Sequence, residues 1–554
     1  MSPTPEDIRS LVTDLTSSRI GRRQFLSRAM ALGLSGSAAS VLLAACGGSS
    51  TSGTSSGQGS GSGAAKPPTT TLTYRPQTDI QDLDPAFWVS QDDVIVFDCV
   101  YEGLVTFKPG TWQVVNQLAE SFEPSSNGLK FHFKLKKGIE WQKGYGEVRA
   151  SDVKFSYERI AGLTKPKLNS PYSGDWSALD SVQVTGPYEG TIILKQPFAP
   201  LMHSTLPATS GKILPEKAVT KLGKSFSTNP VGSGPYEFVN WVPKQHTTLK
   251  RFANYSGANS AFAAKAPWAT IQTQVIDSDN TAFEAISSGT VAFGYVPPAL
   301  VGQAQSANGL HVYSKPTLNY YFLAISQKNI PNLNLRRAIR SAIDVPGIIK
   351  AAYNGRYTRA YGIIPQSMGI GYWADAPRYD QNLTLAKQYL HKSGQTNVTL
   401  NLTVTNDQTD EAAAQVIAAN LAQIGIKVNL QPQDSATFDA IPGNGGGGPH
   451  RQLVYSSFVS EPDPYWSFIW FTCAQIGLWN WVDWCDAGFT SLLNQGLRTY
   501  DVSKRDQFYI QASKLWDAQA NIAWIAYPTW YFAAQPWVRP SLRPDGYPYL
   551  WNTT

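Results

Sequence analysis

The sequence predicts an α/β fold with parallel or mixed sheets, and two observations support this. Apolar side chains alternate at 398–404, a helical pattern covers 410–424, and a second short strand follows at 427–430. A β-α-β unit of this kind places its two strands in parallel, joined by a right-handed crossover. Hydrophobic residues make up 42% of the chain and charged residues 16%, which is typical of a globular body with ample core.

Three further segments carry clear periodicity. Residues 129–135 alternate with period two and predict a half-buried strand, with a returning strand starting at 139–141. Ser151 is the expected cap of the next helix. Residues 335–349 predict another helix, with Asn334 as its cap. The buried faces expected for these two helices are Val153, Tyr157 and Ile160 in the first, and Leu335, Ile339, Ala342 and Ile343 in the second.

The first 45 residues have the features of a cleavable export signal. Arg22 and Arg23 precede an apolar run at 29–43 that glycines and serines interrupt, so the run is too short and polar to span a bilayer stably. The arrangement resembles a twin-arginine signal ending in a lipobox at Cys46, whose thiol would carry a diacylglycerol. We therefore expect an extracytoplasmic chain that is lipid-anchored to the cell membrane. The alternative is a transmembrane anchor followed by an ordinary cysteine.

A flexible tether is predicted at 46–69. This stretch consists almost entirely of Gly, Ser, Thr, Ala and Pro, which cannot bury enough apolar area to offset the entropy of ordering. Residues 53–57 match the hydrolase pattern G-x-S-x-G, but the tether supplies neither the strand nor the helix that this motif needs, so the match is by chance. A second glycine-rich loop, 441–450, is expected to be mobile.

Charge and cysteine spacing exclude several classes of function. The net charge of +6 is mild and no Lys/Arg cluster concentrates it, so the sequence lacks the basic patch expected of a nucleic-acid-binding protein. No C-x-x-C pair or His/Cys cluster has metal-ligand spacing, and we expect neither a metal nor a cofactor. Outside the cytoplasm, Cys473 and Cys485 are expected to form a disulfide, with two buried free thiols as the alternative. Cys99 would then be unpaired and buried.

Aromatic residues are unusually abundant, with 17 Trp, 26 Tyr and 23 Phe. Five tryptophans lie between residues 466 and 484, and each buried indole N–H needs a hydrogen-bond partner. We therefore expect some of them to line a small-molecule cavity. The alternative is a tryptophan-rich core edge around the disulfide loop. The five are Trp466, Trp470, Trp479, Trp481 and Trp484.

Eight short blocks occur in order between residues 72 and about 540. They are Leu83-Asp84-Pro85, Tyr101-Glu102-Gly103-Leu104, Leu118-Ala119-Glu120, Ala150-Ser151-Asp152-Val153, Pro230 to Tyr236, Leu335-Arg336-Arg337-Ala338 with Ile343-Asp344, Glu461-Pro462-Asp463-Pro464, and Lys504 to Tyr509. Together they resemble the extracytoplasmic solute-binding proteins of peptide/nickel-type ABC (ATP-binding cassette) importers, the large three-part class also called solute-binding protein family 5, with Ser233 where the family has Thr. No single block decides the resemblance, but eight in the same order make it specific.

The resemblance implies a two-lobed periplasmic-binding-protein fold of type II, with mixed sheets and a subdomain inserted in lobe 1. The corresponding division is a signal at 1–45, a tether at 46–69, lobe 1 at 70–115, 226–313 and 527–554, the inserted subdomain at 116–225, and lobe 2 at 314–526. The block 232–236 is expected to form a tight turn near the domain crossing.

The resemblance also implies a function without catalysis. A cleft between two lobes would close on a peptide or peptide-like solute and present it to the permease and ATPase subunits of an importer, with the receptor itself a monomer. Alternatives with the same fold are receptors for an oligosaccharide, an opine or a metal chelate, or a sensor that feeds no transporter. A secreted lipid-anchored hydrolase is the alternative from another class, but no motif nominates its nucleophile, base and orienting acid.

The residues that would touch a solute follow from the same alignment. In peptide-binding members an aspartate shortly before the Asp-Pro element pairs with the ligand's ammonium group, and Ser460 stands at that position. Because a serine cannot neutralise a buried ammonium, either Glu461 or Asp463 takes the role, or the ligand has no free amino terminus. Glu461 as an ordinary surface carboxylate is the alternative. Further candidates are Trp466, Trp479, Asn480 and Trp481 in lobe 2, Tyr320 at its start and Trp88 in lobe 1.

Overall fold

A computed structural model describes residues 70–256, 266–434, 437–438 and 451–554, which form one compact unit. The predicted signal, Cys46, the tether and the loop 441–450 lie outside the described residues. Within the described ranges, no helix is both long and apolar enough to cross a membrane.

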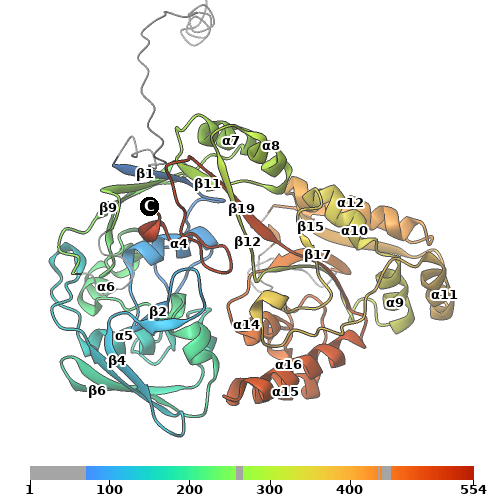
Figure 1. Ribbon diagram of the computed structural model, residues 1–554. Coiled ribbons are helices and arrows are strands. Elements are labelled where there is room, and N and C mark those ends of the chain that lie inside the picture. The colour runs from blue at the N-terminus through green and yellow to red at the C-terminus, as the bar shows by residue number, and fades with distance from the viewer. Residues whose placement is uncertain (1–69, 257–265, 435–436, 439–450) are drawn as a thin grey trace, which may run out of the picture. The chain divides into compact units, whose positions relative to one another are not determined.

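A seven-stranded mixed sheet is assembled from three separate stretches of the described chain, 71–75, 236–316 and 529–534 (Figure 1). Its central strand β1 is parallel to both neighbours, and the other pairs are antiparallel. In spatial order the strands are β12 (His311–Pro316), β19 (Thr529–Ala534), β11 (Phe293–Tyr295), β1 (Thr71–Arg75), β10 (Thr270–Gln274), β9 (His246–Arg251) and β8 (Tyr236–Val242).

A six-stranded mixed sheet contains the predicted β-α-β unit. Strand β15 runs parallel to β16, and α12 (Gln408–Ala422) connects them, capped by the carboxylate of Asp407. The helix buries Ile417 and Leu421, whereas Val416 is only half-buried. In spatial order the described strands are β14 (Thr358–Arg359), β18 (Ile522–Tyr527), β13 (Tyr320–Ile325), β17 (Leu453–Phe458), β15 (Thr399–Thr405) and β16 (Lys427–Gln433).

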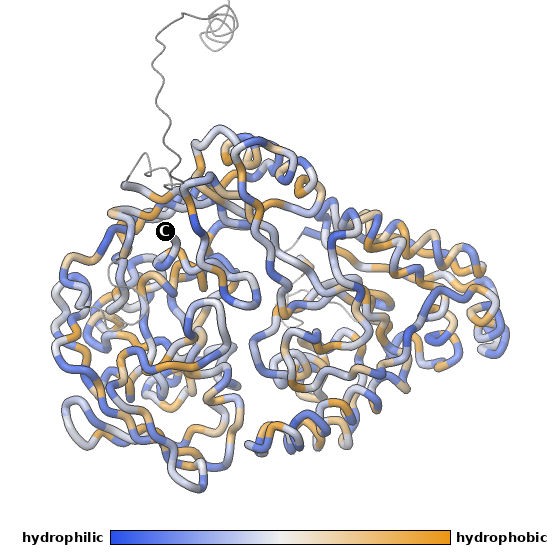
Figure 2. Tube along the Cα trace, in the orientation of Figure 1, coloured by the Kyte–Doolittle hydropathy of each residue, from blue (hydrophilic) through white to orange (hydrophobic). Residues whose placement is uncertain are grey.

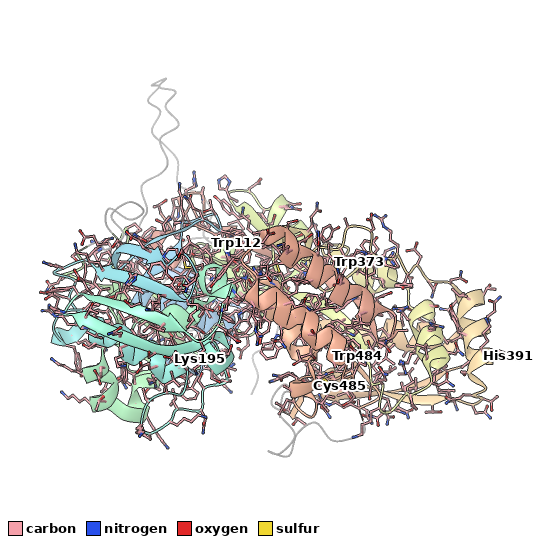
Figure 3. The ribbon with its side chains drawn as sticks, turned by 90° about the horizontal axis from the view of Figure 1, so that it is seen from below. Trp112, Lys195, Trp373, His391, Trp484 and Cys485 are labelled. Atoms are coloured by element: carbon pink, nitrogen blue, oxygen red, sulfur yellow. A yellow bond between two sulfur atoms is a disulfide. The ribbon has the colours of Figure 1, made fainter. Side chains whose placement is uncertain are left out.

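A smaller antiparallel sheet lies within residues 119–194. Its described strands are, in order, β4 (Ala119–Pro124), β5 (Lys130–Leu135), β7 (Glu189–Leu194) and β6 (Leu179–Gly186), with the short pair β2 (Val105–Phe107) and β3 (Val114–Asn116) nearby in sequence. Strand β5 alternates exposed and buried side chains, which confirms the period-two prediction. Figure 3, seen from below, shows this sheet in blue-green beside the pair of red-brown helices α15 and α16.

Helices cover the sheets, with apolar positions facing inward. Figure 2 shows hydrophobic and hydrophilic positions alternating along the helices at the right of the view. The described helices are α4 (Gln91–Val100), α5 (Ala150–Ile160), α6 (Glu216–Leu222), α7 (Asp279–Ser287), α8 (Val301–Ser306), α9 (Leu333–Ala342), α10 (Val345–Tyr353), α11 (Leu383–Ser393), α12, α14 (Pro464–Phe468), α15 (Ala487–Arg498) and α16 (Val502–Asp517).

Two local predictions around α5 were wrong. Residues 139–141 form no returning strand, because β5 already pairs with β4 and β7 on its two sides. Trp141 instead donates its indole N–H to Asp152. That carboxylate also accepts the backbone N–H of Arg149, so Asp152 takes the capping role and Ser151 lies inside the helix.

The helix predicted at 335–349 is two helices. α9 ends at Ala342, and α10 begins at Val345 with Asp344 as its cap. The physical reason is Pro346. A helix accepts proline only in its first turn, and proline disfavours helical backbone in the residue before it, so a single helix cannot run through this position. The cap of α9 is Asn332, whose side chain accepts the backbone N–H groups of Asn334 and Leu335.

Glycines at 232 and 234 allow two backbone segments to touch. A Cβ on Gly232 would lie 1.9 Å from the carbonyl oxygen of Val100, at the end of α4, and one on Gly234 would lie 2.6 Å from that of Cys99. Between them, Ser233 donates to the buried carboxylate of Glu102. At this block the backbone therefore lies very close to the backbone at the end of α4, which explains the two glycines.

We predict that Gly232→Ala lowers the free energy of unfolding by about 1–3 kcal/mol, because the added methyl must push two backbones apart. The matched control is Gly362→Ala, where a Cβ meets nothing within 4 Å. Chemical denaturation monitored by circular dichroism measures both variants. Equal midpoints for the two variants would contradict the tight approach.

Candidate ligand pocket

A hollow of about 200 Å³ opens between the end of β17 and the segment before α4. It is lined mainly by apolar and aromatic side chains with a few polar groups, as small-molecule sites are. Aromatic side chains dominate its walls, and a single carboxylate stands among the described lining residues. The lining is Trp88, Val89, Tyr172, Phe458, Val459, Ser460, Glu461, Trp466, Trp470 and Trp479.

A buried ion pair fixes one wall of the pocket. Asp463 caps α14 by accepting the backbone N–H of Tyr465, and its other oxygen lies 2.7 Å from Arg505 Nη2. Both side chains are only 1% exposed. The sequence left Asp463 as a possible partner for a ligand ammonium, and this interpretation was wrong because the carboxylate is already neutralised by Arg505.

Ser460 lies at the pocket with its polar groups occupied. Its backbone N–H donates to Asn319, and its hydroxyl lies 2.6 Å from that of Ser467. The side chain of the adjacent Glu461 differs from that of Ser460. Among the described residues, its Oε2 is buried and makes no hydrogen bond.

The opposite wall is built around Trp88. Asp84 and Arg159 form an ion pair, with Nη1 2.9 Å from one carboxylate oxygen, which holds the Leu-Asp-Pro turn just before Trp88. Tyr172 donates its hydroxyl to the backbone carbonyl of Trp88 at 2.6 Å. The two rings stack with centroids 4.8 Å apart and an angle of 6° between planes.

The aromatic rings form a continuous chain across the pocket. The Tyr172 centroid lies 6.4 Å from that of Trp466, Trp466 lies 5.9 Å from Trp470, and Trp470 lies 6.5 Å from Trp479. Phe458 lies 6.1 Å from Trp470 and closes the chain from the β17 side. These rings belong to segments far apart in sequence, so aromatic residues line the pocket from two sides.

The environment of Glu461 favours its protonated form. Burial raises the pKa of this carboxyl to about 7; Arg543 lowers it, and Asp545 and Asp98 raise it further. Asp175, behind the Tyr172 wall, also has its pKa raised by burial, although Ser210 donates a hydrogen bond to it. A carboxyl group whose pKa is close to 7 and that lies in a concave site is typical of functional positions.

Two indole N–H groups of the lining also lack partners. Trp88 Nε1 and Trp470 Nε1 are buried and make no hydrogen bond among the described residues, and Glu461 Oε2 shares this property in the same pocket. Buried polar atoms are almost always paired in folded proteins, and each one left unpaired costs about 1–3 kcal/mol. All three atoms belong to residues that line this one pocket.

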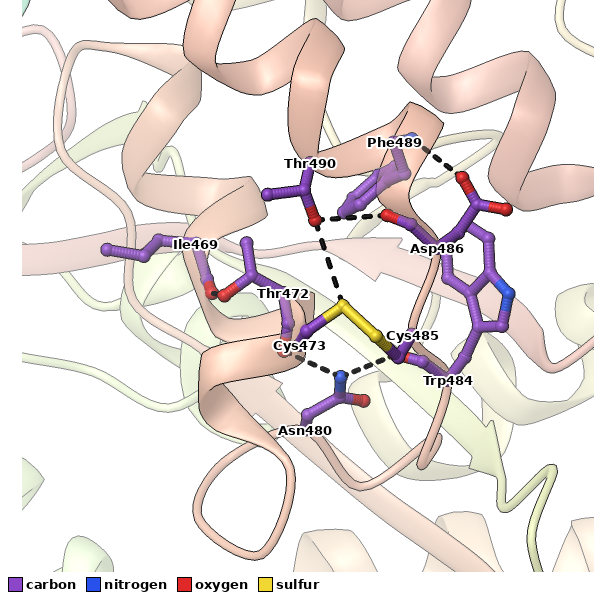
Figure 4. The surroundings of a disulfide bond; sticks show 9 residues. All are labelled: Ile469, Thr472, Cys473, Asn480, Trp484, Cys485, Asp486, Phe489 and Thr490. Carbon is purple, nitrogen blue, oxygen red and sulfur yellow. Dashed lines mark hydrogen bonds between the residues drawn. A yellow bond between two sulfur atoms is a disulfide. The ribbon is translucent and has the colours of Figure 1, made fainter.

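Three of the residues that the sequence nominated lie outside this lining. Tyr320 is fully buried and donates its hydroxyl to the carbonyl of Ser467. Trp481 packs its ring against Phe458 and Phe438. Asn480 donates to the carbonyls of Thr472 and Trp484 and so braces the disulfide loop (Figure 4).

Cys473 and Cys485 are joined by a disulfide just before α15. Figure 4 shows Thr490 beside the bond and Asn480 between the two ends of the loop. Trp484 is buried against Phe489 and Trp516, so this tryptophan belongs to the core and not to the pocket. Cys99 is unpaired and buried, and its thiol donates to the carbonyl of Ile95.

Sequence reasoning missed two of the aromatic wall residues, Phe458 and Tyr172, and it named Trp470 only as one of five tryptophans of which some should line a cavity. Trp470 belongs to the recognised tryptophan cluster, and its unpaired N–H is visible only in the structure. Phe458 ends a buried strand, where sequence predicts core. Tyr172 lies in an irregular stretch far from the other wall, and no sequence pattern could have placed it there. Within the described ranges, no group of three or more His, Cys, Asp or Glu could hold a metal ion.

Comparison with known proteins identifies the family. The model of the bacterial extracellular solute-binding proteins, family 5 (middle), matches residues 113–476. The chain belongs to this family. Its members bind solutes for ABC importers, so the chain is a substrate-binding protein and not an enzyme.

Individual relatives are distant. The chain is 24% identical over 410 residues to the glutathione-binding protein GsiB of Shigella flexneri, covering 72% of this chain and 78% of the relative. The dipeptide-binding protein of Pseudoalteromonas in complex with Met-Leu aligns with a TM-score of 0.77 and 20% identity over 87% of this chain and 99% of that one. AgaA of Agrobacterium tumefaciens in complex with agropinic acid gives 0.75 and 22% over 87% and 98%. The solved structures show that the fold is that of type II periplasmic binding proteins.

Proposed function

We propose that this chain is a lipid-anchored extracytoplasmic receptor that captures a peptide-like solute in a cleft between two lobes and delivers it to an ABC importer. The observation that carries the proposal is the two-sided pocket, whose walls come from Trp88 and Tyr172 on one side and from residues 458–479 on the other. A solute touching both walls stabilises the closed state, which an importer can then recognise.

The lobes of this proposal follow the division expected from the sequence, with lobe 1 at 70–115, 226–313 and 527–554, lobe 2 at 314–526, and the inserted subdomain at 116–225. Hydrogen bonds already join the inserted subdomain to lobe 2. Ala199 donates its backbone N–H to the carbonyl of Leu497 at 2.8 Å, and Tyr500 donates its hydroxyl to the carbonyl of Gly128 at 2.8 Å. These contacts fit a cleft that shuts on its solute.

Peptide-like solutes are favoured over the other solutes of the same fold. The dipeptide-binding and glutathione-binding relatives support a peptide, and the agropinic acid complex supports an opine. The pocket itself combines large apolar walls with a few unpaired polar atoms, which suits a peptide carrying aromatic or aliphatic side chains. Membrane permease and ATPase subunits are the proposed partners, and the receptor acts as a monomer.

We predict that di- to hexapeptides raise the melting temperature of the protein and change its tryptophan fluorescence, because a ligand bound only by the folded state stabilises it by mass action. The gain is about 2.7 kcal/mol at a peptide concentration 100-fold above Kd. Trp470→Ala should reduce this gain, whereas Trp373→Ala, a tryptophan outside the pocket, should not.

Oligosaccharides are tested beside the peptides in the same melting-temperature measurement, and three results would contradict the proposal in different ways. Stabilisation by oligosaccharides alone would move the solute to another class within the same fold. Turnover of a peptide, ester or glycoside bond at an enzymatic rate would favour the hydrolase. Equal losses in Trp470→Ala and Trp373→Ala would mean that the pocket is not the binding site.

We predict that Cys46→Ser moves the exported chain from the membrane fraction to the soluble fraction, because a serine cannot carry the thioether-linked lipid. Ser49→Ala, three residues away in the tether, is the control and should stay with the membrane. Fractionation followed by intact-mass measurement reads out both. A Cys46→Ser protein that remains in the membrane would instead support the transmembrane anchor.

A further inference from the structure

We propose that a clasp between the inserted subdomain and lobe 2 slows the release of every solute by the same factor, whatever the chemistry of that solute. The clasp consists of Gly128, Phe198 and Ala199 on the subdomain, and of Leu497 and Tyr500 at the end of α15. The proposal rests on the proposed function, because it requires that the cleft between the two lobes opens before a solute leaves.

Backbone hydrogen bonds form the first part of the clasp. Residues 197–200 read Pro-Phe-Ala-Pro, and because proline has no N–H, only the two middle residues can donate from the backbone. The N–H of Ala199 donates to the carbonyl of Leu497 at 2.8 Å, and that of Phe198 donates to the hydroxyl of Tyr500 at 3.3 Å. Both donors of this buried stretch therefore bond to lobe 2, and they lose these partners when the cleft opens.

Tyr500 joins the two sides at a second point. Its hydroxyl donates to the carbonyl of Gly128 at 2.8 Å. Gly128 lies in the turn between β4 and β5 with a φ of +65°, and a Cβ at this position would lie 2.5 Å from ring carbon Cε2 of Tyr500. The tyrosine ring thus lies directly against the backbone of a turn in the inserted subdomain. Because Tyr500 is 43% exposed, it can be replaced without opening a cavity in a core.

Apolar packing adds to these hydrogen bonds. Leu497 is only 9% exposed and belongs to an apolar cluster whose other described members all lie between residues 86 and 213. Tyr465, a second residue of lobe 2, packs against the same cluster. The end of α15 therefore buries apolar surface in the core around the inserted subdomain, and opening of the cleft would return this surface to water.

The clasp stands on a well-fixed part of lobe 2. The carbonyl of Gly496, next to Leu497, accepts a hydrogen bond from Arg505 at 2.9 Å, and Arg505 is the partner of Asp463. None of the clasp residues is among the described residues that line the pocket. The clasp therefore stabilises the closed state by the same amount whichever solute is inside, and its loss should speed the release of all solutes equally.

Amide hydrogen exchange of the full chain without added solute tests whether the clasp holds. Mass spectrometry of a fragment that contains 197–200 reports on the two donors. Tyr500→Phe removes the hydroxyl that makes two of the bonds, so the Ala199 N–H should exchange about 5-fold faster. Tyr188→Phe is the matched control, because it removes a hydroxyl bond to Glu147 within the inserted subdomain, and exchange should stay at the wild-type rate. Equal exchange in the two variants would overturn the clasp.

Release rates test whether the clasp controls departure of the solute. The protein is loaded with Met-Leu or with Tyr-Gly-Gly and diluted in a stopped-flow instrument, and tryptophan fluorescence follows dissociation. Tyr500→Phe should release both peptides about 5-fold faster, and Tyr188→Phe should release them at the wild-type rate. Unchanged rates in Tyr500→Phe, or faster release of one peptide alone, would overturn the proposal.

A change on the opposite side of the clasp tests the pairing itself. Gly128→Ala places a methyl against the ring of Tyr500, so it should also speed release. When Tyr500→Ala has removed the ring, Gly128→Ala should have no further effect on release, because two changes in one contact are not additive. Additive effects in the double variant would contradict the pairing of these two residues.

These experiments separate the clasp from the receptor function. Faster exchange in Tyr500→Phe, together with no binding of any peptide or oligosaccharide, would support the clasp and contradict the proposed function. Peptide binding with exchange and release unchanged in Tyr500→Phe would overturn the clasp and leave the receptor function intact.

Discussion

The buried ion pair between Asp463 and Arg505 is the constraint on which the pocket depends. Arg505 also donates to the carbonyl of Gly496 and lies over the ring of Tyr509, so it ties α14 to α15 and α16. Removing one partner of such a pair leaves an uncompensated buried charge and costs about 3–5 kcal/mol. With Asp463 fixed as the cap, the start of α14 is fixed, and the rings of Trp466 and Trp470 are held over the hollow.

The contrast with Glu461, two residues earlier, is informative. One carboxylate of this short segment is fully paired inside the protein, while the other keeps a buried oxygen without a partner. Proteins violate the rule of satisfied polar groups mainly where function requires it. Asp463 and Ser460 hold the short segment that carries Glu461.

Much of the fold could be predicted from the sequence, and the errors have local physical causes. The β-α-β unit at 399–433 carries strong periodicity, and its strands and helix formed where expected. The helix at 335–349 was split because the effect of Pro346 outweighs apolar periodicity. The strand at 139–141 failed because β5 takes its second partner from β7, a segment far along the chain that local pattern cannot reveal.

The site was only partly predictable. Five nominated residues, Trp88, Ser460, Glu461, Trp466 and Trp479, meet at the pocket although Trp88 is far from the others in sequence. The resemblance to the family placed Trp88 with the other four residues, which no local sequence pattern could do. Tyr172 was missed because it lies in an irregular stretch, and Asp463 was misjudged because its partner Arg505 lies 42 residues away. Whether a polar atom has a hydrogen-bond partner depends on the packed structure. The sequence therefore cannot tell that Asp463 is paired and that Glu461 Oε2 is not.

The central claim is that the aromatic hollow at Glu461 is where a solute is held. A crystal structure of the protein with a bound peptide tests this claim most directly. The account predicts the peptide inside the hollow, in contact with Trp88 and Tyr172 on one side and with Trp470 on the other. A peptide bound elsewhere, or a hollow filled by the protein's own tryptophans, would contradict it.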